Sequence, residues 1–256
     1  MSRRLAALCC SAVMFAAIVC TKSRGGFLGL MAMGAVVVYY TARLKPAIVF
    51  GVIFAGLLAL PLMPSSFWDR MDSITNADTD PTGSREARIR LLEPGVEVFA
   101  RNPLTGIGAG QFQNYNEPGV AIERWRVTHN VWLQVAAELG VFGLGIFAFL
   151  VLRAYTACFK AMRWLSPPRR RTAAPAAQTA VNEAERYTLD MNAKGMLAAI
   201  VGWTVCSFFA SVAFNWTFYY VLALAVAGRE IVQARRIAAL PEAAPATAAR
   251  LLRVHA

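Results

Sequence analysis

Histidine is scarce in this chain. Only 2 of its 256 residues are histidine, and His129 is the only one outside the extreme C-terminal tail. No His, Asp or Glu around His129 has the spacing of a zinc site. Five cysteines fall in or beside apolar segments, which favours neither a disulfide framework nor a thiolate metal site: Cys9, Cys10, Cys20, Cys158 and Cys206. We therefore expect no metal ion and no other cofactor.

Acidic residues are also few, 15 against 26 lysines and arginines, which gives a net charge of +11. A surplus of this size could indicate a nucleic-acid partner. The basic residues, however, cluster at alternate connections between apolar segments: Arg3 and Arg4; Arg43 and Lys45; Arg153, Lys160, Arg163 and residues 169–171; then Arg229, Arg235 and Arg236. This is the positive-inside pattern of membrane proteins, so we expect these connections in the cytoplasm and no nucleic-acid partner.

Apolar residues make up 57% of the chain, and its mean hydropathy of +0.45 exceeds that of an ordinary soluble domain. Six segments approach the roughly 20 apolar residues that cross a bilayer. They are residues 5–21, 27–42, 47–63, 131–152, 196–213 and 216–228. The sequence therefore predicts an all-α integral membrane protein with about six transmembrane helices, a count of five being the alternative.

The predicted parts of the chain are residues 1–63 with three helices, a water-facing loop 64–130, residues 131–228 with three more helices, and a cytoplasmic tail 229–256. Within the third part, residues 153–194 are predicted to be a cytoplasmic linker, because proline, alanine and charge dominate residues 166–180. Both termini then lie in the cytoplasm and the loop lies outside. Residues 20–23 form a poor cleavage site, so we expect the first apolar segment to be retained.

The loop is predicted to contain short helices. Ser84 is a suitable N-cap for a helix with apolar residues at amphipathic spacing, namely Ile89, Leu92, Val96 and Phe99, and Pro94 is expected to kink it. Gly106, Gly108 and Gly110 match a dinucleotide-binding loop only superficially, since no strand precedes them and no apolar helix follows. We interpret them as a turn.

Three arginines are candidates for anion binding. Arg24 stands before two glycines at the predicted start of a helix, where a phosphate or pyrophosphate could be held. The alternative is an interfacial arginine that reaches lipid headgroups. Arg85 and Arg88 are three residues apart on one predicted helix face and could grip one anionic group together. Their alternative is a solvated face paired with nearby glutamates.

His129 lies where the polar loop meets an apolar helix. Its imidazole could accept a proton from a hydroxyl near neutral pH. The alternative is a helix-entry residue satisfied by water or a neighbouring carbonyl. Asn130, Gln134 and Glu138 follow at roughly helical spacing, and such polar side chains are costly to bury in a membrane without a purpose.

Three stretches occur in order along the chain: TKSRGG at 21–26, RNPLTGIGAGQF at 101–112 and HNVWLQVAAELGVFGL at 129–144. Together they resemble the O-antigen ligase/polymerase superfamily of polytopic bacterial glycosyltransferases, and the third stretch is the most specific. The resemblance implies a protein of the bacterial inner membrane, with many transmembrane helices and one large periplasmic loop, which would be residues 64–130 here.

The resemblance also implies a reaction and its residues. A glycan on undecaprenyl pyrophosphate would be transferred to a hydroxyl of lipid A–core, of another glycan or sometimes of a protein, without a metal ion. A single displacement would then invert the anomeric carbon. The superfamily's catalytic histidine corresponds to His129. Its Ser-Arg-Gly arginine corresponds to Arg24, and its loop arginine corresponds to Arg85 or, as second choice, Arg88; these arginines would bind the pyrophosphate. Ligases and polymerases differ only in the acceptor, and both remain open.

Members of the superfamily usually have more spans than the six predicted here. We therefore expect this chain to correspond to the later part of a longer enzyme or to act beside a second membrane chain. A non-catalytic partner, or a subunit that exports or transports polysaccharide, is the alternative to an enzyme.

Overall fold

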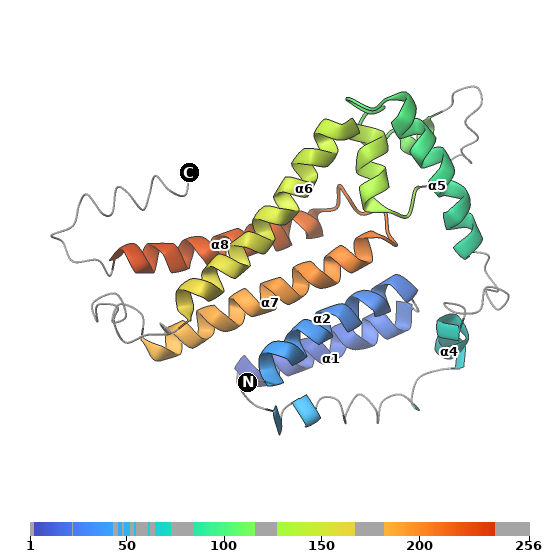
Figure 1. Cartoon of the computed structure of the whole chain (residues 1–256). Coiled ribbons are helices and arrows are strands. Elements are labelled where there is room, and N and C mark those ends of the chain that lie inside the picture. Colours follow the sequence, from blue (N-terminus) through green and yellow to red (C-terminus); the bar gives the residue numbers. More distant parts are fainter. Residues whose placement is uncertain are drawn as a thin grey trace. The chain divides into compact units, whose positions relative to one another are not determined.

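The computed structural model describes residues 3–21, 23–42, 46–47, 49–51, 54, 61, 65–72, 84–115, 127–166 and 182–238. Within these ranges every element is helical, which confirms the predicted all-α class (Figure 1). The main elements are α1 (Arg3–Thr21), α2 (Arg24–Ala42), α4 (Ser65–Asp72), α5 (Ser84–Arg101), the 3₁₀ turn η3 (Phe112–Asn114), α6 (Val131–Leu165), α7 (Glu183–Ser207) and α8 (Trp216–Ala238).

The helices follow the predicted apolar segments, but several of their bounds differ from the predicted ones. Helix α1 ends at Thr21 as predicted, and α2 begins three residues before the predicted Phe27. Most of the predicted third span, 47–63, lies outside the described residues. Helices α6, α7 and α8 all continue into charged sequence, so that the predicted linker 153–194 is helical at both ends and the predicted tail begins as helix.

Two of the described helices, α2 and α6, are long and apolar enough to cross a membrane. Helix α1 contributes a shorter apolar stretch, Leu5–Thr21. These helices fit a membrane protein, whereas the count of six spans stays a prediction.

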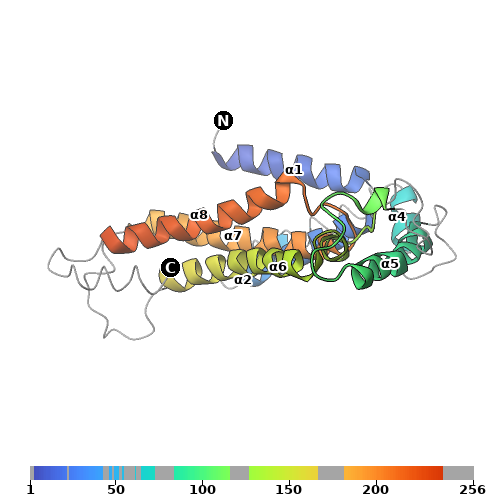
Figure 2. The same cartoon turned by 90° about the horizontal axis from the view of Figure 1, so that it is seen from above.

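By internal contacts the chain forms two compact units, which are described separately. One comprises Phe149–Ile200 and Tyr219–Ala256, and its parts of α6, α7 and α8 lie side by side in both views (Figures 1 and 2). Glu185 of α7 pairs with Arg235 of α8 at 2.9 Å, and the Arg236 guanidinium lies 4.8 Å from the centre of the Trp164 ring of α6. These contacts explain why the three helices extend beyond their apolar stretches.

The other unit comprises Met1–Ala148 and Val201–Phe218. In it α2 packs closely against the last turns of α7. A Cβ atom on Gly29 would lie 2.2 Å from the Cys206 sulfur and 2.9 Å from the Gly202 carbonyl oxygen. Glycine at both positions lets the two backbones approach, as is common between membrane helices.

Helix α6 is broken at Gly140, where φ is 64° and ψ is −166°. The first nine residues, Val131–Leu139, and the long part from Val141 meet at a sharp bend beside the end of α5 (Figure 1). The sequence predicts one continuous span from Val131 to Leu152, and the bend is the main departure from that prediction. Its cause is the close approach of the loop described next.

Candidate functional site

The segment from Asn102 to Tyr115 wraps the end of the nine-residue helix. The N–H groups of Ile107 and Gly108 donate to the carbonyl oxygens of Ala137 and Glu138 at 3.2 and 2.8 Å. After the bend, the Val141 N–H donates to the Pro103 carbonyl at 2.8 Å. The last carbonyls of a helix have no partner within it, so this loop supplies the partners that the break at Gly140 removes.

Two glycines make this close approach possible. A Cβ on Gly106, where φ is 67°, would lie 2.3 Å from the Glu138 carbonyl carbon. A Cβ on Gly140 would lie 2.2 Å from the Leu104 carbonyl oxygen. Both glycines have a positive φ, and at both a neighbouring backbone occupies the space that a side chain would need. Each of these two features alone disfavours any other residue.

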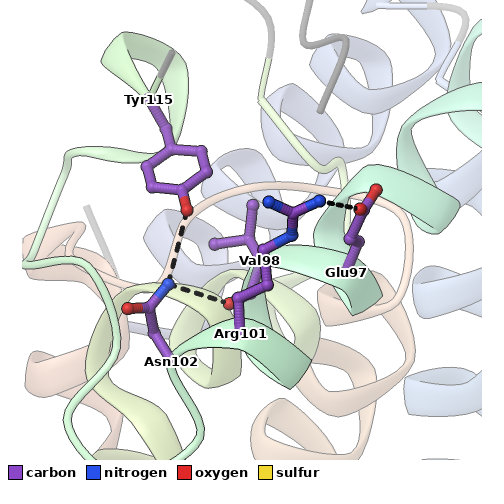
Figure 3. A network of polar contacts seen from close by, with 5 residues as sticks. All are labelled: Glu97, Val98, Arg101, Asn102 and Tyr115. Carbon is purple, nitrogen blue, oxygen red and sulfur yellow. Dashed lines mark hydrogen bonds and ion pairs between the residues drawn. The ribbon is translucent and has the colours of Figure 1, made fainter. Parts of the chain in front are cut away.

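Helix α5 and the loop share a small apolar core with the nine-residue helix. Val98, Phe112 and Ala137 are buried together, with Ile107 and Tyr115 packed against them. Behind this core the Asn102 side-chain amide donates to the Val98 carbonyl and to the Tyr115 hydroxyl, both at 3.4 Å, whereas Arg101 pairs with Glu97 on the exposed side (Figure 3).

The predicted helix from Ser84 is confirmed as α5, which runs through Pro94 to Arg101. A Cβ on Gly95 would lie 2.6 Å from a methyl carbon of Leu133, so α5 packs tightly on the nine-residue helix. The side chains of residues 84–90 lie outside the described residues, so the predicted roles of Arg85 and Arg88 stay predictions.

His129 occupies a tight turn at the entrance of α6. Its φ of 50° is the only positive value of a non-glycine residue in the described part of the chain. Such a conformation costs roughly 1–3 kcal/mol and persists only where the surroundings enforce it. Buried Thr128 donates its hydroxyl to the Asn130 carbonyl at 2.9 Å and so closes the turn around the half-buried His129.

Asn130 caps α6. Its side-chain oxygen accepts the N–H groups of Trp132 and Leu133 at 3.0 and 3.1 Å. An N-cap of this kind stabilises a helix by about 1 kcal/mol. The cap fixes where the helix begins and therefore fixes the position of His129, the residue before it.

A connector, defined here as Cys206–Ser211, contacts the turns that carry both His129 and Arg24. On one side the Ser211 hydroxyl lies 3.3 Å from the Thr128 hydroxyl, and Ser207 accepts the Trp132 indole N–H at 2.9 Å. On the other side, Cys206 donates its thiol to the Gly25 carbonyl at 3.4 Å. A Cβ on Gly25 would lie 2.7 Å from Phe209 Cβ. The connector thus contacts residues that directly neighbour two predicted site residues, Arg24 and His129.

Arg24 differs in one respect from its prediction. Because α2 begins at Arg24, Ser23 becomes its cap, and the Ser23 hydroxyl accepts the Gly26 N–H at 3.1 Å. The Gly26 N–H group is therefore bonded within the chain. Anion binding by Arg24 would rest on the guanidinium rather than on this N–H group.

Sequence reasoning missed the connector, because α7 was expected to continue to Ala213, whereas it ends at Ser207. Its serines belong to no motif, and only the break in apolar sequence at Ser207 and Ser211 marks them. Among the described residues, no three His, Cys, Asp or Glu side chains come together as a metal site would require.

Ser207→Ala is expected to lower the unfolding free energy by about 1–3 kcal/mol, because it removes the acceptor of the part-buried Trp132 indole N–H. Thermal unfolding of the purified protein, followed by tryptophan fluorescence, measures the change. Ser166→Ala is the matched control, since the hydroxyl of this exposed residue, which directly follows α6, bonds the Met162 carbonyl one turn earlier. Equal melting temperatures for the two variants would contradict the prediction.

Comparison with known proteins gives one match. The family model described as O-antigen ligase matches residues 9–148, more than half of the chain. No curated protein and no solved structure matches it significantly. The matched range contains Arg24, the loop that wraps Glu138, and the His129 turn. It therefore includes all three stretches that carry the resemblance in the sequence. The chain therefore belongs to the O-antigen ligase family.

Proposed function

We propose that this protein is a glycosyltransferase of the bacterial inner membrane that moves a glycan from undecaprenyl pyrophosphate to an acceptor hydroxyl. The acceptor is lipid A–core or another glycan. The proposal includes about six spans, cytoplasmic termini and a periplasmic loop 64–130, in keeping with the clustered positive charges.

The observation that carries the proposal is the connector, which contacts both the Arg24 turn and the His129 turn. An arginine suits a pyrophosphate, because its planar guanidinium matches phosphate oxygens. A histidine at a constrained turn suits proton transfer from a hydroxyl. Contact of one segment with both turns supports a site that combines these two groups.

In the proposed mechanism His129 removes the proton of the acceptor hydroxyl as its oxygen attacks the anomeric carbon. The bond from that carbon to the pyrophosphate oxygen breaks, and its electron pair leaves with undecaprenyl pyrophosphate. Arg24, with Arg85 or Arg88, stabilises the charge that develops on the leaving group. A single displacement of this kind inverts the anomeric configuration.

The test uses the purified full chain in liposomes, with an undecaprenyl-pyrophosphate-linked glycan as donor and either lipid A–core or a second molecule of the lipid-linked glycan as acceptor. Product on lipid A–core assigns a ligase, and lengthened lipid-linked glycan assigns a polymerase. If neither forms, and only a second co-purifying membrane chain supplies the activity, the chain is a partner subunit and the proposal of an enzyme is wrong.

Arg24→Ala is expected to lower the transfer rate about 100-fold, the scale of removing one preorganised group that stabilises charge. Arg24→Lys keeps the charge but loses the planar fork, so it should keep part of the rate. Arg101→Ala is the matched control, an exposed arginine that pairs with Glu97. Unchanged transfer with altered glycan flux across the membrane would instead support an export subunit.

A further inference from the structure

We infer that Glu138 is a positioning residue for the transfer reaction, because its buried carboxylate holds the Gly106–Phe112 loop on the nine-residue helix that His129 precedes. This inference rests on the proposed function. The inference adds to the proposed function a residue that lies away from the reacting groups and sets their geometry.

Each oxygen of the carboxylate accepts a backbone N–H group. The Gly110 N–H donates to one oxygen at 2.9 Å, and the Phe112 N–H donates to the other at 3.1 Å. Glu138 is only 1% exposed, and a buried carboxylate is tolerated only with such partners. A loop with three left-handed glycines often cradles an external phosphate. Here the carboxylate of the chain itself takes the place of that anion.

The position of Glu138 in the fold links these two hydrogen bonds to the site. Its helix begins directly after the His129 turn, about 13 Å away at 1.5 Å per residue, so Glu138 does not reach the reacting atoms. The loop that it holds continues directly from α5, the helix whose backbone carries Arg85 and Arg88. Glu138 therefore fixes α5 relative to His129 from a distance.

Stability alone does not account for this arrangement. Gln134, one turn earlier and 8% exposed, hydrogen-bonds Glu138, yet its own carbonyl oxygen has no hydrogen-bond partner. A buried polar pair with an unsatisfied acceptor is less favourable than apolar packing of the same shape. Polar groups retained under such conditions are typical of functional sites.

The experiment compares the unsubstituted full chain with its Glu138→Gln and Glu138→Ala variants, all purified. Hydrogen exchange and transfer kinetics are measured for each. In both variants we expect the amides of Gly110 and Phe112 to exchange at least tenfold faster. We expect kcat to fall about 100-fold, the effect of a displacement of about 1 Å at a reacting centre, with little change in KM. Formate, a small carboxylate, should restore both protection and transfer in Glu138→Ala, whereas chloride at equal ionic strength should not. Glu97→Gln, an exposed glutamate on α5, is the matched control.

Three outcomes overturn the inference: normal kcat in Glu138→Ala despite faster exchange, faster exchange spread over α7 and α8 as well, or no rescue by formate. His129→Asn is assayed in parallel. Active Glu138 variants beside an inactive His129→Asn variant refute the role of Glu138 alone. Transfer by His129→Asn refutes the proposed role of His129 as the base, whereas no transfer by the unmodified chain refutes the proposed function itself.

Discussion

Replacing His129 with alanine is expected to abolish glycan transfer while the amount of protein in the membrane stays normal. Without the imidazole, nothing at this turn takes the proton from the acceptor hydroxyl, and general base catalysis alone contributes about 10²–10⁴-fold to a rate. The measurement is the glycan profile of mutant cells on a gel, beside an immunoblot of the protein.

Because φ at position 129 is 50°, alanine also strains the turn. Asparagine tolerates this conformation, so His129→Asn separates loss of the base from loss of the turn. His255→Ala, in the tail, removes the other histidine of the chain as a control. A wild-type glycan profile from either His129 variant would disprove the catalytic role.

Gly140→Ala is expected to prevent the protein from accumulating in the membrane. A methyl group there would lie 2.2 Å from the Leu104 oxygen and 2.6 Å from the Thr105 nitrogen, at a φ of 64°. Backbone strain of about 1–3 kcal/mol and overpacking of about 1–3 kcal/mol add to a cost that is large beside the stability of most domains. Fluorescence-detected size exclusion of a tagged variant measures the folded amount.

Gly145→Ala is the matched control on the same helix, because nothing lies within 4 Å of the added Cβ. It should fold as the wild type does or better, since alanine favours a helix by up to about 1 kcal/mol over glycine. Equal folded amounts for the two variants would show that the break at Gly140 is not required.

The helices of this protein follow from apolar runs, because burial or membrane insertion favours such runs wherever they occur. Their ends do not, because the ends depend on partners distant in sequence, such as Glu185 and Trp164 for the end of α8. The break at Gly140 was not predicted either. A glycine inside an apolar run is common in membrane helices, and the carbonyl that requires it here belongs to Leu104.

The candidate site was predictable in the same uneven way. His129 and Arg24 could be singled out because a lone imidazole and an arginine before two glycines are unusual beside apolar segments. The polar spacing of Gln134 and Glu138 marked them for attention, but the donors to Glu138 lie 26 and 28 residues earlier in the chain. Local sequence does not reveal such pairs, nor the serines of the connector. That Arg24 and His129 lie on the side of the membrane opposite the positively charged connections stays a prediction.

The shortness of the first part of α6 has a mechanical consequence. Nine residues rise about 13 Å, less than half of the roughly 30 Å of a hydrocarbon core, so hydrophobic matching to lipid does not set the height of His129. That height is set by the loop bonds at Pro103, Gly108 and Gly110. In the proposed membrane topology, the long part of α6 would tilt in a thicker or thinner bilayer, while these bonds keep His129 and the short helix in place beside the end of α5.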